Sequence, residues 1–261
     1  MPLDFEQKQV VVDDLLLNYY FYIPENKSGK SLIFLHGWRS DSSVWSKILE
    51  NEKFADFRIY LLDLPGFGKS QLKTSGFNLE KYAKTIKSFI DKLGIKKPIA
   101  IGHSFGGAVL IKLASLNDKL FNSLVLVSSA GIRRKTAKKT LLKAIAKLIS
   151  PLFKPNFMQS FRLNIYRMIG SGDYVATPQL TETYLNIIKE DLSDEMKKIN
   201  NKTLIIWGDS DKDTPKEDAF VMNSKIKKST LKIIRDAGHL IIITDSEIVS
   251  KYIINFINDD F

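Results

Sequence analysis

The sequence contains no cysteine and only three histidines in 261 residues. Without cysteine the chain has no disulfides, no thiolate nucleophile and no cysteine-ligated metal. The three histidines do not form a close cluster with carboxylates along the chain, which argues against a zinc site as well. The residues therefore favour a chemistry that needs no metal.

Long apolar segments are also absent. No run approaches the roughly 18 residues that a membrane-spanning helix needs, and the first residues lack the basic and apolar regions of a signal peptide. We therefore expect no transmembrane segment and a cytoplasmic location. Hydrophobic residues at 44 % and aromatic residues at 11 % exclude a disordered or collagen-like chain.

Acidic residues are missing from one segment, residues 131–172, which we call the basic segment. The whole chain has 39 basic and 29 acidic residues, which gives a net charge of +10. The segment contains ten basic residues, Arg133, Arg134, Lys135, Lys138, Lys139, Lys143, Lys147, Lys154, Arg162 and Arg167, and the rest of the chain is therefore neutral. A solvated helix face, an anionic substrate, an acidic carrier protein and a membrane surface are the alternatives. Aliphatic rather than aromatic residues separate the charges, which argues against nucleic acid.

Short apolar runs alternate with helical patterns along most of the chain. The pattern predicts a β-rich pair at 7–14 and 15–23, later strands at 31–35, 57–62, 98–102, 123–128, 203–207 and 230–234, and helices at 44–52, 78–93, 105–116, 216–225 and 246–257. Such alternation is typical of an α/β fold with a mostly parallel sheet and helices on both faces. Residues 131–201 break the rhythm and are predicted to form a helical insertion.

The strongest chemical motif is Gly102-His103-Ser104-Phe105-Gly106, between a predicted strand and a predicted helix. A serine in such a sharp turn projects above the sheet, and the flanking glycines relieve crowding. The helix that follows offers free N–H groups to a developing negative charge. We predict that Ser104 is a nucleophile; an inert serine in a packing turn is the alternative.

A serine nucleophile needs a base, and histidine is the usual one. His103 is adjacent to Ser104, so its side chain leaves the turn in another direction. His36 directly follows a buried strand, where a backbone role is expected. His239 follows the last predicted strand and should lie at the same sheet edge as Ser104, so we predict His239 as the base.

A carboxylate must orient that histidine. The loop after strand 203–207 contains Asp209, Asp211 and Asp213. Turn formation by Asp209 and helix capping by Asp213 or Thr214 ahead of Pro215 are ordinary alternatives, and spacing does not choose among the three aspartates. The chain order serine, aspartate, histidine is the one expected of a hydrolase sheet.

The oxyanion formed during acyl transfer needs two N–H donors. The backbone N–H of Phe105, next to the nucleophile, is the first. We predict that the N–H of Trp38, in the loop after the strand at 31–35, is the second. The indole of Trp38 is also expected to serve as an apolar cover.

Five motifs in register together resemble the α/β-hydrolase superfamily, specifically its carboxylic-ester and C–C-bond hydrolases with a helical cap. They are His36-Gly37-Trp38, Asp63-Leu64-Pro65-Gly66-Phe67-Gly68-Lys69-Ser70, Gly102-His103-Ser104-Phe105-Gly106-Gly107, Trp207-Gly208-Asp209-Ser210-Asp211 with Pro215, and Gly238-His239. The resemblance implies an eight-stranded sheet, a core of residues 1–130 and 202–261, and a cap of residues 131–201 over the nucleophile. It also selects Asp211 as the acid, because the family's acid stands three residues after the glycine of the tryptophan-glycine pair.

The resemblance further implies a serine hydrolase that cleaves a small carboxylic ester or related acyl substrate and requires no cofactor. Relatives with an aspartate nucleophile, such as dehalogenases and epoxide hydrolases, are disfavoured by Ser104. A receptor-like relative that only binds a ligand and a membrane-associated lipase remain alternatives. The stretch from His36 to Trp45 is similar to esterases that cleave the methyl ester of pimeloyl-acyl-carrier protein. An acidic carrier protein is therefore a candidate partner for the basic segment.

Overall fold

The computed structural model describes residues 3–25, 30–72, 76–133 and 178–259. The chain divides into a larger unit, Met1–Thr74, Asn78–Ile132 and Asp191–Phe261, and a smaller unit, Ser75–Phe77 and Arg133–Glu190. Most of the predicted cap lies outside the described residues, as do nine of the ten basic residues of the basic segment. Residues 191–201 group with the larger unit. The position of the cap over the nucleophile stays a prediction.

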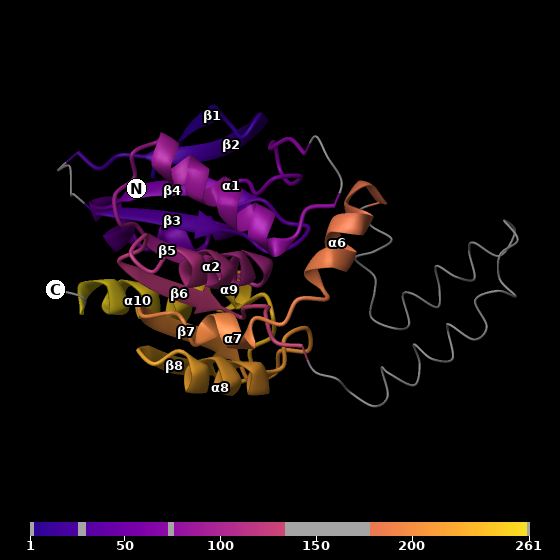
Figure 1. The fold of residues 1–261 in the computed structure, drawn as a ribbon. Helices are drawn as coiled ribbons and strands as arrows, with labels where there is room; N and C mark the ends of the chain where they lie inside the picture. The colour runs from indigo at the N-terminus through magenta and orange to yellow at the C-terminus, as the bar shows by residue number, and fades with distance from the viewer. Residues whose placement is uncertain (1–2, 26–29, 73–75, 134–177, 260–261) are drawn as a thin grey trace, which may run out of the picture. The chain divides into compact units, whose positions relative to one another are not determined.

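The larger unit is built on an eight-stranded sheet in the order β1-β2-β4-β3-β5-β6-β7-β8 (Figure 1). The strands are β1 (Glu6–Val12), β2 (Leu15–Tyr22), β3 (Ser31–Leu35), β4 (Arg58–Leu62), β5 (Ile99–His103), β6 (Ser123–Val127), β7 (Lys202–Gly208) and β8 (Ser229–Ile234). β1 pairs antiparallel with β2, and β2 antiparallel with β4, whereas all other pairs are parallel. This confirms the prediction of a mostly parallel eight-stranded sheet.

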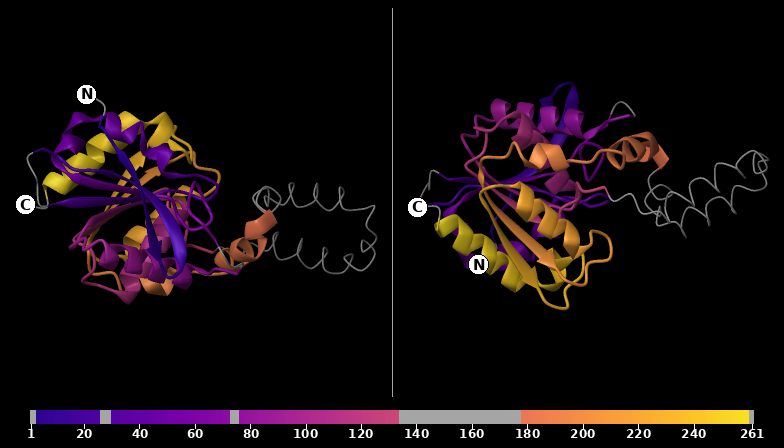
Figure 2. Two further views of the ribbon diagram at one scale, coloured as in Figure 1. Left: turned by 90° about the horizontal axis from the view of Figure 1, so that it is seen from above. Right: turned by 60° about the horizontal axis from the view of Figure 1, so that its bottom comes forward.

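Helices cover both faces of this sheet (Figure 2). One layer contains α1 (Leu79–Lys92), α2 (Phe105–Leu116), α7 (Ser193–Met196) and α8 (Lys216–Lys225). The opposite layer contains α9 (Ile241–Thr244), α10 (Ser246–Asn258) and the 3₁₀ helices η1 (Ser42–Trp45), η2 (Ile48–Glu50) and η3 (Glu52–Asp56). Within the described ranges, no helix is long and apolar enough to cross a membrane.

Every second residue of the central strands packs into the layer of α9 and α10. Phe34, Ile101 and Val125 belong to one buried cluster with Trp45 of η1 and Ile253 of α10. The intervening strand residues are buried as well, on the side of α1, α2 and α8. Because both faces are covered, the central strands read as continuous apolar runs rather than alternating ones.

The segment 44–52 is not the single helix that its spacing predicts. It forms parts of three 3₁₀ helices instead. Asn51 adopts an extended backbone (φ −71°, ψ 113°), and its side chain accepts the N–H of Lys53, which starts a new turn. Asparagine competes with the helix in this way because its side chain reaches nearby N–H groups. The prediction of one helix here is therefore wrong.

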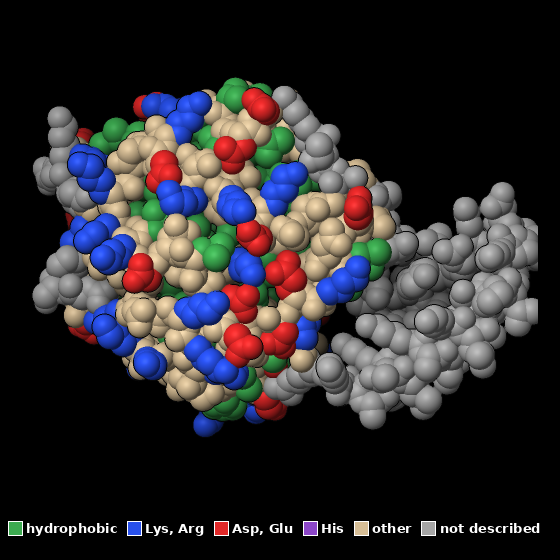
Figure 3. Space-filling view, viewed as in Figure 1, with side chains coloured by type: hydrophobic (Ala, Val, Ile, Leu, Met, Phe, Trp, Pro, Cys, Tyr) green, Lys and Arg blue, Asp and Glu red, His purple; other side chains and the backbone are tan. Residues whose placement is uncertain are grey.

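Charges of both signs are interspersed on the face formed by α1, α2, α7 and α8 (Figure 3). Lys112 of α2 and Glu195 of α7 lie 2.9 Å apart and are largely buried, while pairs such as Lys84 with Glu80 are exposed. Exposed pairs of this kind contribute little to stability, because water and salt screen their attraction. The mixture agrees with the electrical neutrality of the chain outside the basic segment.

The described part of the smaller unit centres on α6 (Thr181–Ile187), preceded by the 3₁₀ helix η6 (Pro178–Leu180). The guanidinium of Arg133 donates hydrogen bonds to the carbonyls of Ile187 (3.2 Å) and Glu190 (3.1 Å). A cation at a helix C-terminus stabilises its exposed carbonyls and its dipole. The first basic residue of the basic segment, Arg133, therefore caps a helix of its own unit.

Candidate active site

The candidate residues follow the carboxyl ends of parallel strands. Ser104 follows β5, Asp211 follows β7, and His239 lies beyond β8. Trp38 lies in the loop after β3. Parallel strands end at one edge of the sheet, and ligands typically bind at that edge.

The backbone at Ser104 is strained, with φ at 50° and ψ at −112°. Such a conformation in a non-glycine residue costs about 1–3 kcal/mol. The N–H of Ser104 donates to the carbonyl of Val127 (3.0 Å), and its own carbonyl accepts the N–H of Ala130 (3.0 Å). Both bonds join the turn to the end of β6, which compensates for the strain.

The glycines of the motif are required by close backbone contacts. A Cβ on Gly106 would lie 2.2 Å from the carbonyl oxygen of Leu35, at the end of β3. A Cβ on Gly102 would lie 2.7 Å from the carbonyl carbon of Gly106. Because backbone atoms cannot move aside as a flexible side chain does, these two positions accept only glycine without rearrangement.

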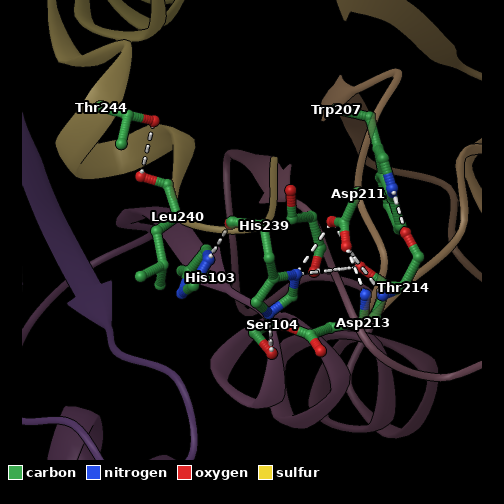
Figure 4. A network of polar contacts seen from close by, with 10 residues as sticks. His103, Ser104, Trp207, Asp211, Asp213, Thr214, His239, Leu240 and Thr244 are labelled. Carbon is green, nitrogen blue, oxygen red and sulfur yellow. Dashed lines mark hydrogen bonds and ion pairs between the residues drawn. The ribbon is translucent and has the colours of Figure 1, made fainter. Parts of the chain in front are cut away.

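Ser104, His239 and Asp211 form one hydrogen-bonded chain (Figure 4). The Oγ of Ser104 lies 3.0 Å from His239 Nε2, and His239 Nδ1 lies 2.8 Å from Asp211 Oδ2. The carboxylate accepts the Nδ1 proton, which leaves the Nε2 lone pair facing the serine hydroxyl. The structure thus brings together the three residues that the sequence analysis singled out.

The Asp211 carboxylate is enclosed by donors. Its Oδ1 accepts the N–H groups of Asp213 and Thr214, each at 2.9 Å, and its Oδ2 contacts the hydroxyl of Thr214 at 2.9 Å. Burial favours a raised pKa of Asp211, but the hydrogen bond and charge of His239 and the bonds from Thr214 outweigh it and hold this pKa below its ordinary value. Asp211 is therefore the ionised partner of the histidine.

The other two aspartates of this loop have different surroundings. Asp209 accepts the N–H of Asp236 at 2.8 Å and so ties its loop to the turn after β8. Asp213 is exposed. It forms, with Asp211 and His239, the one group of three potential metal ligands found among the described residues. Because Asp211 Oδ2 and His239 Nδ1 already share a hydrogen bond, we interpret these two residues as an acid–base pair rather than as part of a metal site.

His36 has the backbone role expected of it. Its Nδ1–H donates to the carbonyl of Gly37 (2.8 Å), and its Nε2 accepts the N–H of Leu64 (2.9 Å). The ring is fully buried, which lowers the pKa of His36 below its ordinary value. It therefore joins the loops after β3 and β4 as a neutral group.

His103 has a role that the sequence analysis missed. Its side chain is buried, and its Nε2–H donates to the backbone carbonyl of His239 at 3.0 Å. Burial, together with the nearby charge of His239, lowers the pKa of His103 to about 3, so the ring is neutral at physiological pH. Its position directly before the serine was the available signal, because successive strand residues point to opposite faces.

The two predicted oxyanion donors flank the serine. Phe105 is the first residue of α2, where helix N–H groups have no intrahelical partner. A Cβ on Gly37 would lie 3.4 Å from the Cβ of Ser104, so the loop that carries Trp38 adjoins the nucleophile. The indole of Trp38 packs edge-on against Phe105 (5.3 Å between ring centroids) and Phe67 (4.9 Å). The predicted apolar cover is thus present.

Comparisons with known proteins agree with this architecture. A family model described as the alpha/beta hydrolase fold matches residues 30–166. The uncharacterized hydrolase YugF of Bacillus subtilis is 24 % identical over 92 % of this chain and 94 % of its own. A pimeloyl-[acyl-carrier protein] methyl ester esterase of Citrobacter koseri is 34 % identical over 44 % of this chain and 42 % of its own.

A solved structure of a membrane phospholipase A, a bacterial virulence factor, superimposes with a TM-score of 0.78. It is 22 % identical, and the match covers 98 % of this chain and 86 % of that one. At this identity the similarity concerns the fold alone. The family model matches more than half of the 261 residues, so the chain belongs to the alpha/beta hydrolase fold family.

Proposed function

We propose that this protein is a serine hydrolase that cleaves a carboxylic ester or related acyl substrate through a covalent acyl-enzyme. The observation that carries the proposal is the continuous chain from Ser104 Oγ through His239 to Asp211, with contacts of 3.0 and 2.8 Å. A nucleophile, a base and an orienting acid in hydrogen-bond contact are the minimum for this chemistry.

The first half of the reaction forms the acyl-enzyme. Ser104 Oγ attacks the carbonyl carbon while His239 Nε2 takes the hydroxyl proton, and the carbonyl electron pair moves onto oxygen. The N–H groups of Phe105 and Trp38 stabilise that oxyanion. When it collapses, the bond to the leaving group breaks and His239 returns the proton to the departing alcohol.

The second half of the reaction uses water. His239 removes a proton from a water molecule that attacks the acyl carbon, and the same proton is returned to Ser104 as the acid leaves. Asp211 keeps the Nδ1 proton of His239 in place and stabilises the imidazolium in both halves. Each of these steps uses only groups of this chain and water.

Labelling with a fluorophosphonate, followed by turnover of a panel of esters, tests the proposal. We expect labelling of the wild type at Ser104 and a loss of roughly 10⁶-fold in kcat for Ser104→Ala. The panel should span short, long and carboxylate-bearing acyl chains. Hydrolysis that survives in Ser104→Ala would refute the nucleophile, and stoichiometric labelling without multiple turnover on any ester would favour a ligand-binding relative.

A partner follows from the charge of the basic segment. We infer that an acidic acyl carrier protein presents the acyl group there, because ten basic residues stand in the segment without one acidic residue. The partial similarity to a carrier-protein esterase supports this assignment. Titration against an acidic carrier protein at increasing salt tests it: binding should weaken as salt screens the charges, and undetectable or salt-insensitive binding would overturn it.

A further inference from the structure

Thr214 contacts both the candidate acid, Asp211, and the candidate base, His239. It lies between Asp211 and Pro215, the residue before α8. Its hydroxyl lies 2.9 Å from Asp211 Oδ2, 3.2 Å from His239 Nδ1 and 3.2 Å from the carbonyl oxygen of Ser128 (Figure 4). One oxygen therefore meets the acid, the base and the end of β6.

The backbone of Thr214 is held on both sides of its hydroxyl. Its N–H donates to Asp211 Oδ1 at 2.9 Å, and its carbonyl accepts the indole N–H of Trp207 at 2.7 Å. Trp207 is fully buried in β7, so this anchor is part of the sheet. The position of the hydroxyl is therefore determined by the strand rather than by a free loop.

The proton count allows both contacts with the pair at once. The Thr214 hydroxyl has one proton, and the carboxylate oxygen of Asp211 is the closest and the only charged of its acceptors. When the hydroxyl donates this proton to Asp211, a lone pair of the Thr214 oxygen is still available to accept the Nδ1–H of His239. The Nδ1 proton then has two acceptors, the carboxylate at 2.8 Å and the hydroxyl at 3.2 Å.

We propose that Thr214 is a positioning residue of the hydrolase: its hydroxyl holds Asp211 Oδ2 against His239 and supports the Nδ1 proton through the reaction. The inference rests on the proposed function. Figure 4 marks no hydrogen bond between Thr214 and Ser104, and Thr214 makes or breaks no covalent bond in the proposed reaction. It acts through Asp211 and His239, on whose alignment proton transfer from the serine depends.

Two variants isolate the hydroxyl, and the first of them has nearly the size of threonine. Thr214→Val removes it while the backbone N–H to Asp211 Oδ1 remains, and Thr214→Ser keeps it. Hydrogen bonds to charged groups are stronger than those between neutral groups. We therefore expect Thr214→Val to lower kcat on p-nitrophenyl acetate, and the rate of fluorophosphonate labelling, by at least roughly 10-fold with KM unchanged. Thr214→Ser should retain most of both rates.

A spectroscopic measurement separates positioning from simple loss of loop stability. The Nδ1 proton of His239 should give a low-field ¹H NMR signal because it is hydrogen-bonded to a carboxylate, and the absence of this signal from Asp211→Asn would assign it. In Thr214→Val we expect this signal to shift and to broaden by exchange with water, whereas Thr214→Ser should keep it. The thermal unfolding of each variant shows that it is folded.

The outcomes are distinguishable. If Ser104→Ala remains active, the proposed function fails, and the NMR signal still reports on the contact between Thr214, Asp211 and His239. If Ser104→Ala is inactive but folded Thr214→Val keeps the wild-type kcat, labelling rate and signal, the proposed function stands and the role of Thr214 is overturned. Equal losses in Thr214→Val and Thr214→Ser would also overturn it, because the hydroxyl would then not be the cause.

Discussion

The loop after β5 and the loop after β7 hold their reactive side chains in two different ways. Ser104 is placed by backbone sterics: a strained φ of 50° and two glycines against which other backbone atoms lie. Asp211 is placed by hydrogen bonds from Asp213, Thr214 and His239. Steric placement tolerates almost no change, because packed backbone atoms do not yield. Placement by hydrogen bonds is graded, since each bond contributes a limited free energy.

The largest effect should come from breaking the steric placement. In Gly106→Ala the new Cβ would lie 2.2 Å from the oxygen of Leu35, so β3 and α2 must separate. We expect loss of fluorophosphonate labelling and a free energy of unfolding lower by roughly 3 kcal/mol, the upper end for overpacking. Urea denaturation measures the second quantity.

Gly238→Ala is the matched control for this experiment. Gly238 also lies in a loop at the active-site edge, but a Cβ there meets nothing within 4 Å. The free energy of unfolding of Gly238→Ala should therefore stay close to that of the wild type. Equal destabilisation by the two substitutions would show that the contact between Gly106 and Leu35 does not place the nucleophile turn.

The next effect concerns the acid. Asp211→Asn keeps the size of the side chain but removes the charge that orients His239 and stabilises its imidazolium, so we expect kcat to fall by roughly 10⁴-fold. Asp213→Asn should leave kcat near the wild-type value, because Asp213 contributes its backbone N–H to Asp211 rather than its carboxylate. Steady-state kinetics on one ester measures both, and the reverse ranking would reassign the acid.

A third prediction concerns the pH dependence of stability. His103 stays neutral in the folded protein down to a pKa of about 3, whereas the unfolded chain takes up a proton near pH 6.5. The unfolded state then binds more protons between these values, so stability falls as the pH is lowered. We expect this residue alone to cost the wild type about 2 kcal/mol between pH 7 and pH 5.

His103→Gln tests this dependence because its amide can still donate to the carbonyl of His239 but does not titrate. Urea denaturation at pH 7 and pH 5 should show a smaller loss of stability in the variant than in the wild type. His36 is also buried and neutral, but its contribution is the same in both proteins and cancels. Parallel pH profiles would contradict the assignment of His103.

The same contrast explains which parts of the molecule could be predicted from the sequence. The nucleophile turn could be predicted because close backbone contacts allow only glycine at positions 102 and 106. The parallel strands could be predicted because burial on both faces makes them apolar throughout. The acid could not be chosen by spacing, since Asp209, Asp211 and Asp213 are distinguished by their burial and their hydrogen-bond partners, which the local sequence does not specify.

Other features could not be predicted because they depend on contacts between residues that are far apart in the sequence. The hydroxyl of Thr214 meets Ser128 and His239, and His103 meets the backbone of His239, 136 residues away. No local pattern encodes such a pair. The helix predicted at 44–52 failed for a local reason, the competing side-chain bond of Asn51. The predicted cap stays untested, because most of it lies outside the described residues.

The smallest effect should come from the anchor of the acid loop, and the chain offers a matched pair of tryptophans to measure it. Trp207 and Trp45 are both fully buried. The indole N–H of Trp207 donates to the carbonyl of Thr214 at 2.7 Å, whereas that of Trp45 has no partner within the described part of the chain. Replacing each with phenylalanine removes a similar volume, so the difference between the variants isolates one hydrogen bond.

We expect the free energy of unfolding of Trp207→Phe to be about 1 kcal/mol lower than that of Trp45→Phe, because Trp207→Phe leaves the carbonyl of Thr214 without its buried donor. Trp207→Phe should also slow the labelling of Ser104, since Thr214 is the link from β7 to Asp211 and His239. Trp45→Phe should not, because Trp45 packs against Phe34 on the opposite side of the sheet from α2. Equal labelling rates in the two variants would mean that the acid loop keeps its geometry without the indole, and that hydrogen bonds to Asp211 are sufficient to place it.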